Sequence, residues 1–148
     1  MTLKERITED MKAAMRARDQ QGLEAIRLLR AAIQRREVDE RTELDDSEVL
    51  SVVQKLIKQG QESIEQFRRG NREDLAGREE HMIERLRGYL PEPLSDAELD
   101  AMIDEAIGET GAAGIRDMGA VMGRLRNRVQ GRADMAQVST RVKARLGA

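Results

Sequence analysis

The sequence has no cysteine and no tryptophan, and Phe67 and Tyr89 are its only aromatic residues. Without cysteine, the chain can form no disulfide, thiolate metal site or thiol nucleophile. Proteins usually bind unpaired bases by stacking them on aromatic side chains. We expect both aromatic residues to be buried, so this mode of binding is nearly excluded. Leu, Ile, Val, Ala and eight Met must fill the interior instead.

Long apolar runs are also missing. No segment approaches the ~18–20 apolar residues of a membrane-spanning helix. The first residues contain acids and lack the apolar centre of a signal peptide, and they fit a transit peptide poorly. We therefore expect a cytoplasmic protein with no membrane partner.

Patterns of catalysis and metal binding are missing as well. His81 is the only histidine, and its helical spacing from Met82 and Leu86 predicts that it is exposed. There is no Glu-x-x-His pattern, no nucleophile–histidine–acid set and no glycine-rich phosphate loop. The acidic clusters near Asp45 and Asp100 are typical of helix caps and solvated faces, with a Mg²⁺ site or an acid–base pair as the alternative. We predict no catalytic residue, no cofactor and no metal site.

Apolar periodicity predicts helices along the whole chain. Asp45 with Glu48 and Ser95 with Glu98 have the spacing of capping boxes. Gly70 is in the position of a C-terminal helix glycine. The expected helices cover approximately residues 3–18, 23–33, 46–69, 75–89 and 96–107, followed by two short helices after Gly114.

Pro91 and Pro93 are the only prolines, and they mark the best candidate domain boundary. The sequence thus predicts an all-α fold with two domains. The larger N-terminal domain, residues 1–90, has about four helices, and the smaller C-terminal domain, residues 91–148, has three. Gly60 inside the third helix costs about 1 kcal/mol relative to Ala, which indicates a close contact with another helix.

Charge is distributed unevenly in the C-terminal part, although the net charge of the chain is only −2. Residues 92–110 contain seven carboxylates and no Lys or Arg, whereas residues 111–148 contain eight Lys or Arg and only two acids. Clustered arginine on one surface is a common feature of phosphate-binding proteins. The pattern favours a helical module that binds a polyanion.

Two similar segments 17 residues apart make up this basic region. Asp117 and Asp134 are expected to be helix N-caps. The same offset relates apolar residues to apolar residues and basic residues to basic residues; the pairs are Val121 with Val138, Leu125 with Val142, Val129 with Leu146, Arg124 with Arg141, Arg126 with Lys143, and Arg128 with Arg145. A duplication and two unrelated short amphipathic helices both explain the offset. Either way, we expect the basic side chains to face solvent, with ion pairing to the acidic helix as the alternative.

The segment DMGAVMGRLRNRVQGRADMAQVSTRVKARL resembles the C-terminal signature of the GatB/YqeY-like family. Further matching segments occur upstream in the same order, so the resemblance covers nearly the whole chain; they are IRLLRAAIQ at 26–34, ESIEQF at 62–67, REDLA at 72–76 and YLPEPLSDAEL at 89–99. The resemblance implies an all-helical protein whose smaller domain is similar to the tail of the B subunit of the tRNA-dependent amidotransferase, which helps to bind tRNA. Among the matched residues, Arg132 and Lys143 are the candidates for RNA contact.

We therefore expect a non-catalytic protein that binds tRNA, or a tRNA-bound enzyme such as an aminoacyl-tRNA synthetase or amidotransferase. The expected contacts come from the basic C-terminal residues, namely Arg124, Arg128, Arg132, Arg141, Lys143 and Arg145, and the N-terminal domain can add Arg27, Arg30, Arg35 and Arg36.

Three alternatives stay open. The first is an amidotransferase-like carbon–nitrogen ligase with glutamine as amido-N-donor, which the family label implies. The second is a protein-interaction module. DNA binding ranks lower, because the acidic helix would oppose placing a neighbouring helix in a groove.

Overall fold

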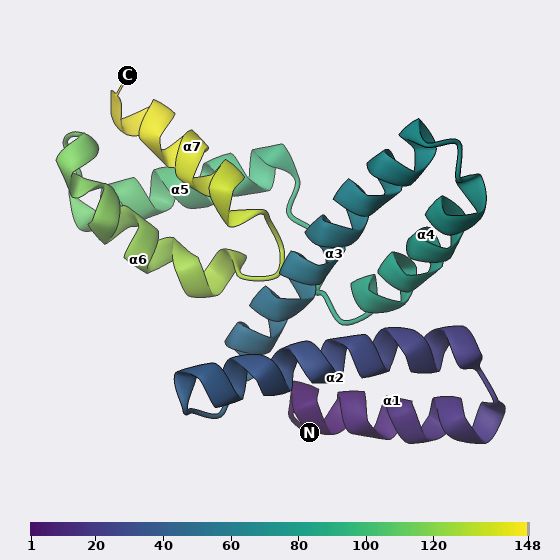
Figure 1. Cartoon of the computed structure of the whole chain (residues 1–148). Coiled ribbons are helices and arrows are strands. Elements are labelled where there is room, and N and C mark those ends of the chain that lie inside the picture. The colour runs from purple at the N-terminus through teal and green to yellow at the C-terminus, as the bar shows by residue number, and fades with distance from the viewer. Residues whose placement is uncertain (148) are drawn as a thin grey trace. The chain divides into compact units, whose positions relative to one another are not determined.

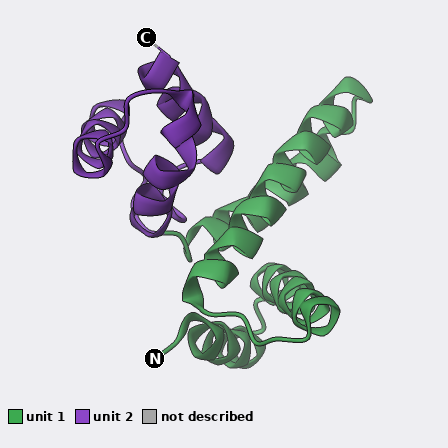
Figure 2. Ribbon diagram, turned by 90° about the vertical axis from the view of Figure 1, so that its left-hand side faces the viewer, with its two compact units in different colours: residues 1–90 green, residues 91–148 purple. Residues whose placement is uncertain are grey.

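The computed structural model describes residues 1–147, and within them every regular element is helical. The chain divides into an N-terminal unit, residues 1–90, and a C-terminal unit, residues 91–148 (Figure 2). The elements of the N-terminal unit are α1 (Leu3–Ala17), α2 (Gln20–Glu40), α3 (Asp46–Arg69) and α4 (Glu73–Arg87). Those of the C-terminal unit are α5 (Asp96–Thr110), a 3₁₀ turn η1 (Ile115–Asp117), α6 (Met118–Val129) and α7 (Met135–Gly147).

The predicted starts of two helices are confirmed by their caps. The Asp45 carboxylate accepts a hydrogen bond from the Glu48 amide at 2.9 Å and opens α3. At the start of α5, Ser95 and Glu98 form a complete capping box. The N-cap of α7 is also confirmed, since Asp134 accepts from the Ala136 amide at 3.1 Å. Each cap satisfies amide groups that have no partner within the helix.

One local prediction was wrong, and another was right only in part. Gly70 has a φ of −87°, and the left-handed residue after α3 is Asn71, with a φ of 58°. Asn tolerates this conformation because its short polar side chain can form local hydrogen bonds. Asp117 is at the N-cap position of α6, as predicted, but its side chain makes no capping hydrogen bond to that helix. It accepts instead from the Ala113 amide at 2.9 Å, because the 3₁₀ turn η1 comes directly before α6.

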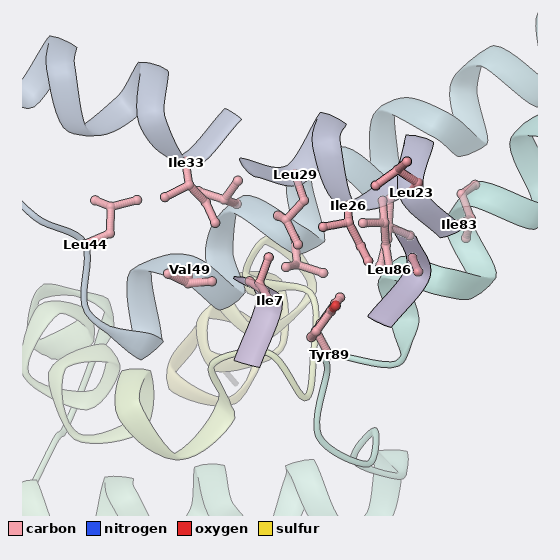
Figure 3. Packing of buried hydrophobic residues seen from close by; sticks show 14 of the residues in the cluster. Ile7, Leu23, Ile26, Leu29, Ile33, Leu44, Val49, Ile83, Leu86 and Tyr89 are labelled. Carbon is pink, nitrogen blue, oxygen red and sulfur yellow. The ribbon is translucent and has the colours of Figure 1, made fainter. Parts of the chain in front are cut away.

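The N-terminal unit consists of two helical hairpins around one apolar core. In Figure 1, α1 and α2 lie side by side, and so do α3 and α4. Side chains from all four helices and from the loop residue Leu44 meet in the core (Figure 3). A Cβ atom at Gly60 would lie 2.9 Å from Ile83 Cδ1, so the predicted close contact exists between α3 and α4. Tyr89 is buried, as expected, whereas Phe67 is only half-buried.

The C-terminal unit has a separate apolar core. Its buried residues from α5 are Leu99, Ile103 and Ala106. Those from α6 and α7 are the three apolar pairs of the 17-residue offset, namely Val121, Leu125, Val129, Val138, Val142 and Leu146. The predicted apolar stripes of both helices are therefore confirmed.

Candidate nucleic-acid interface

Most basic residues of the C-terminal unit lie along α6 and α7, on faces turned away from the core. Arg124 and Arg128 are one turn apart on α6, and Arg141 and Arg145 are one turn apart on α7. The buried stripes fix the rotation of both helices, so these arginines project beside the stripe. Whether they are free depends on what α5 places opposite them.

On the α6 side, each arginine has a carboxylate partner from α5. Arg128 Nη2 lies 3.2 Å from Glu105 Oε2, within hydrogen-bonding distance. Arg124 Nη1 lies 3.7 Å from Glu109 Oε2, which is an ion pair without a short hydrogen bond.

On the α7 side the pairing is tighter. Arg141 lies 2.9 Å from both Asp96 and Asp100, so its guanidinium bridges two carboxylates of α5. Arg145 Nη2 lies 3.2 Å from Asp104 Oδ2.

Arg132 and Lys143 differ from these four residues. Arg132 lies in the turn between α6 and α7, where its Nε donates to the Glu92 carbonyl at 2.9 Å. Its own carbonyl accepts from the Leu94 amide at 2.9 Å, and Glu98 lies 4.0 Å from its Nη2. Arg132 therefore joins the turn to residues 92–94. Lys143 is exposed and has no ion-pair partner within residues 1–147.

The expectation of basic side chains that are free of ion pairs was therefore wrong for five of the six predicted residues, and the alternative of pairing with the acidic helix is correct. The reason is the spacing of acids on α5. Asp96, Asp100 and Asp104 recur every four residues and line one edge of its apolar stripe. The other edge has Glu98, Glu105 and Glu109. When the stripe packs against α6 and α7, each edge faces one row of arginines.

These ion pairs are at the surface. The exposed fraction of the side chains runs from 28% for Arg141 to 77% for Asp96. Exposed pairs of this kind contribute about 0–1 kcal/mol each, because water screens the charges and both side chains lose conformational freedom. The pairs are therefore weak enough for another anion to replace the carboxylates.

His81 and the acidic clusters were the other residues considered for a functional site. His81 on α4 is exposed, as predicted. Within residues 1–147, no three His, Asp or Glu side chains are grouped as metal ligands would be. No helix in the same range is both long enough and apolar enough to cross a bilayer.

The most perturbed ionisable group is in the N-terminal unit. Burial raises the pKa of Tyr89 well above its ordinary value, and the hydrogen bond that its hydroxyl donates to Asp10 Oδ2 (2.7 Å) adds to this shift. The Arg6 guanidinium lies over the Tyr89 ring, 4.9 Å from its centroid. These contacts join the end of the unit to α1, which is a structural role.

The fold and these contacts define a class: an all-helical protein in which a basic helical hairpin is paired with an acidic helix. Residues 4–146 match the family model described as Yqey-like protein. The chain belongs to the YqeY-like protein family, so the resemblance seen in the sequence is confirmed.

Relatives in fungi match over large parts of the chain. "Altered inheritance of mitochondria protein 41, mitochondrial" of Pyrenophora tritici-repentis is 35% identical over 97% of this chain and 80% of its own length. The protein of the same name from Lachancea thermotolerans is 38% identical over 70% of this chain. The one from Vanderwaltozyma polyspora is 32% identical over the same share. The matched region spans 57% of the length of each of these two relatives.

The relatives also correct one expectation. We expected a cytoplasmic protein because the sequence has no recognisable targeting segment. The three relatives described above are all named as mitochondrial proteins. Their names overturn the cytoplasmic assignment.

Proposed function

We propose that this protein is a non-catalytic module that binds the phosphate backbone of tRNA, either free or bound to an enzyme. The contacts come from the basic side chains of α6 and α7. Two things support the proposal. One is the resemblance of residues 117–146 to the tail of a tRNA-dependent enzyme. The other, which carries the proposal, is that the arginines of both helices are at the surface in ion pairs that a phosphate can replace.

The exchange is physically reasonable. A phosphate group accepts two parallel hydrogen bonds from a guanidinium, as a carboxylate does. The four arginines give up contacts worth at most about 1 kcal/mol each. RNA binding is favoured by the release of counterions from several phosphates at once. Lys143 and Arg126 are exposed and have no ion-pair partner within residues 1–147, so they can make the first contacts without any exchange.

The two units, in this proposal, are two domains that fold independently. The N-terminal domain is the larger and contains four helices, and the C-terminal domain contains three. The support is that each unit has its own apolar cluster made of its own residues. RNA binding is assigned to the C-terminal domain.

The test is a titration of the full chain with total tRNA at several salt concentrations. In a variant with Arg124, Arg128, Arg141 and Arg145 changed to Gln, we expect weaker binding and a slope of log affinity against log salt that is smaller by about four. A control variant changes four paired arginines of the N-terminal unit, namely Arg69, Arg72, Arg78 and Arg87, to Gln.

Equal affinity and equal slope in the test variant and the control would overturn the proposal. Glutamine-dependent release of ammonia by the purified chain would replace it with the amidotransferase alternative. A protein partner that stays bound after RNase treatment and at high salt would favour an interaction module. Preference for duplex DNA over tRNA would also contradict the proposed tRNA binding.

A further inference from the structure

A groove between α1 and α2 in the N-terminal unit is lined by an excess of positive charge. It has a volume of about 530 Å³, and its lining includes Lys4, Arg27 and Arg30 but only one acid, Glu37. The lining also includes Thr8 and Gln34, and the buried residues Ile7 and Ile33 supply apolar surface. The position of α1 beside α2 is seen in Figure 1.

One end of the groove is already neutralised. Lys4 Nζ donates to Glu37 Oε2 at 2.7 Å, and the same oxygen accepts from the Leu44 amide at 2.8 Å. The hydrogen bond from Lys4 lowers the pKa of Glu37, and the one from Leu44 adds to the effect. This end is a structural tie between α1, α2 and the loop before α3.

The other part of the groove is not neutralised. Arg27 and Arg30 lie one turn apart on α2, and neither has a carboxylate partner within residues 1–147. Arg30 Nη1 donates a hydrogen bond to the Met11 thioether sulfur at 2.9 Å. Two like charges this close on a helix repel each other, so the arrangement costs stability when nothing binds there.

The nearby acids are engaged elsewhere. Glu24, one turn before Arg27, is paired with Arg78 of α4 at 2.9 Å. On α1, Glu9 is paired with Lys12, and Asp10 accepts from the Tyr89 hydroxyl. Most arginines of α4 and α6, in contrast, have carboxylate partners. The two guanidiniums are therefore left available for an anion that is not part of the chain.

The geometry points to a phosphate-binding site in this groove, formed by Arg27 and Arg30 with the Gln34 amide as a further donor. The groove contains three cations and one carboxylate, so one doubly charged phosphate monoester or two singly charged phosphodiesters would balance it. Guanidinium groups prefer phosphate and carboxylate oxygens with two parallel hydrogen bonds. The phosphate comes either from a free phosphate monoester or from the backbone of RNA. The site does not depend on the function proposed for the C-terminal unit.

The test uses the full chain labelled with ¹⁵N. Inorganic phosphate, a nucleoside monophosphate and total tRNA are added in separate titrations, and the amide shifts of α1 and α2 are followed. We expect saturable shifts around Thr8, Arg27, Arg30 and Gln34 with inorganic phosphate or the monophosphate. In the Arg27→Gln/Arg30→Gln variant, the affinity should fall about tenfold or more, since charge-assisted hydrogen bonds are lost.

The matched control is Arg16→Gln/Arg41→Gln. It removes the same charge from α1 and from the C-terminal end of α2, at exposed residues outside the groove lining. Phosphate affinity should be kept in this control. Equal losses in both variants, or no shifts in the groove with any of the three phosphates, would overturn the site.

The tRNA titration separates the two sources. If the groove variant also loses affinity for tRNA, the phosphate belongs to an RNA backbone. If this variant binds tRNA as before but no longer binds the nucleoside monophosphate, the ligand is a free monoester. Failure of tRNA to bind anywhere would contradict the function proposed for α6 and α7, but would leave the groove result intact.

Discussion

Tyr89 shows how one residue can report on the folded state. It is the only tyrosine in a chain without tryptophan, so tyrosinate absorbance measures this side chain alone. Burial and the hydrogen bond to Asp10 raise its pKa. An unfolded tyrosine loses its proton near pH 10. The raised pKa stabilises the fold below that pH, and the contribution is lost as the pH rises through the folded value.

We therefore predict that stability falls as the pH rises above about 10. The tyrosinate signal should appear at higher pH in native protein than in denaturant. Tyr89→Phe should abolish this part of the pH dependence, and should cost about 1 kcal/mol at neutral pH because one hydrogen bond is lost. Urea unfolding below and above pH ~10 measures both effects. Identical tyrosinate titrations in native and unfolded protein would contradict the account.

Two helix glycines give opposite predictions. Gly60→Val would press a branched side chain into Ile83 and should destabilise the N-terminal unit by roughly 1–3 kcal/mol. Apart from its chain neighbours and the nearby backbone of α4, Gly77 has no atom of residues 1–147 within 4 Å of an added Cβ. Gly77→Ala should stabilise by up to about 1 kcal/mol, because Ala is the better helix former. Chemical denaturation compares the two; destabilisation by both would contradict the assigned packing.

At the scale of the helices, the ion pairs between α5 and α7 should act as weak surface contacts. Arg141→Met and Asp100→Asn, made singly and together, give the coupling energy of one pair. We predict a coupling of about 0.2–1 kcal/mol, which falls as salt rises. A coupling of several kcal/mol, independent of salt, would mean that the pair is too strong for an RNA phosphate to replace.

The helices themselves were largely predictable, because apolar spacing and capping residues are local signals. The buried stripe of Val121, Leu125 and Val129 was found in this way. The end of α2 was not. The charged stretch after Ile33 has no apolar period, yet it stays helical to Glu40. Arg36 forms an ion pair at 3.1 Å with Glu40, which is one helical turn further along α2.

The candidate site was only half predictable. The sequence showed which faces of α6 and α7 are basic, since this follows from helical spacing. Which carboxylate reaches which arginine depends on how α5 packs. The signal was present all the same: Asp96, Asp100 and Asp104 along one edge of the α5 stripe are spaced to face a neighbouring helix.

At the scale of the molecule, the location of the protein in the cell could not be predicted from helix patterns. Helix periodicity and core packing report on folding, and they are the same in any compartment. The names of the relatives provided the correction.

Each of the two units should also fold when the other is absent. The core of the C-terminal unit contains residues of that unit only. We predict that residues 91–148, expressed alone, are helical and unfold cooperatively, although a domain this small has only marginal stability. Circular dichroism during urea unfolding tests this. Leu125→Ala removes a fully buried side chain at a cost of about 2–5 kcal/mol and should unfold the fragment. A fragment that is unstructured without the substitution would contradict independent folding.

The most direct measurement concerns the acids of α5, because RNA must displace them from the arginines. We predict that Asp104→Asn/Glu105→Gln/Glu109→Gln binds tRNA about tenfold more tightly than the unaltered chain, since three competing pairs of about 0.5 kcal/mol each are removed. The control Glu9→Gln/Glu65→Gln/Glu84→Gln removes the same charge from exposed pairs of the N-terminal unit. The gain in tRNA affinity of this control should be much smaller. Unchanged or weaker tRNA binding by the α5 variant would contradict the account.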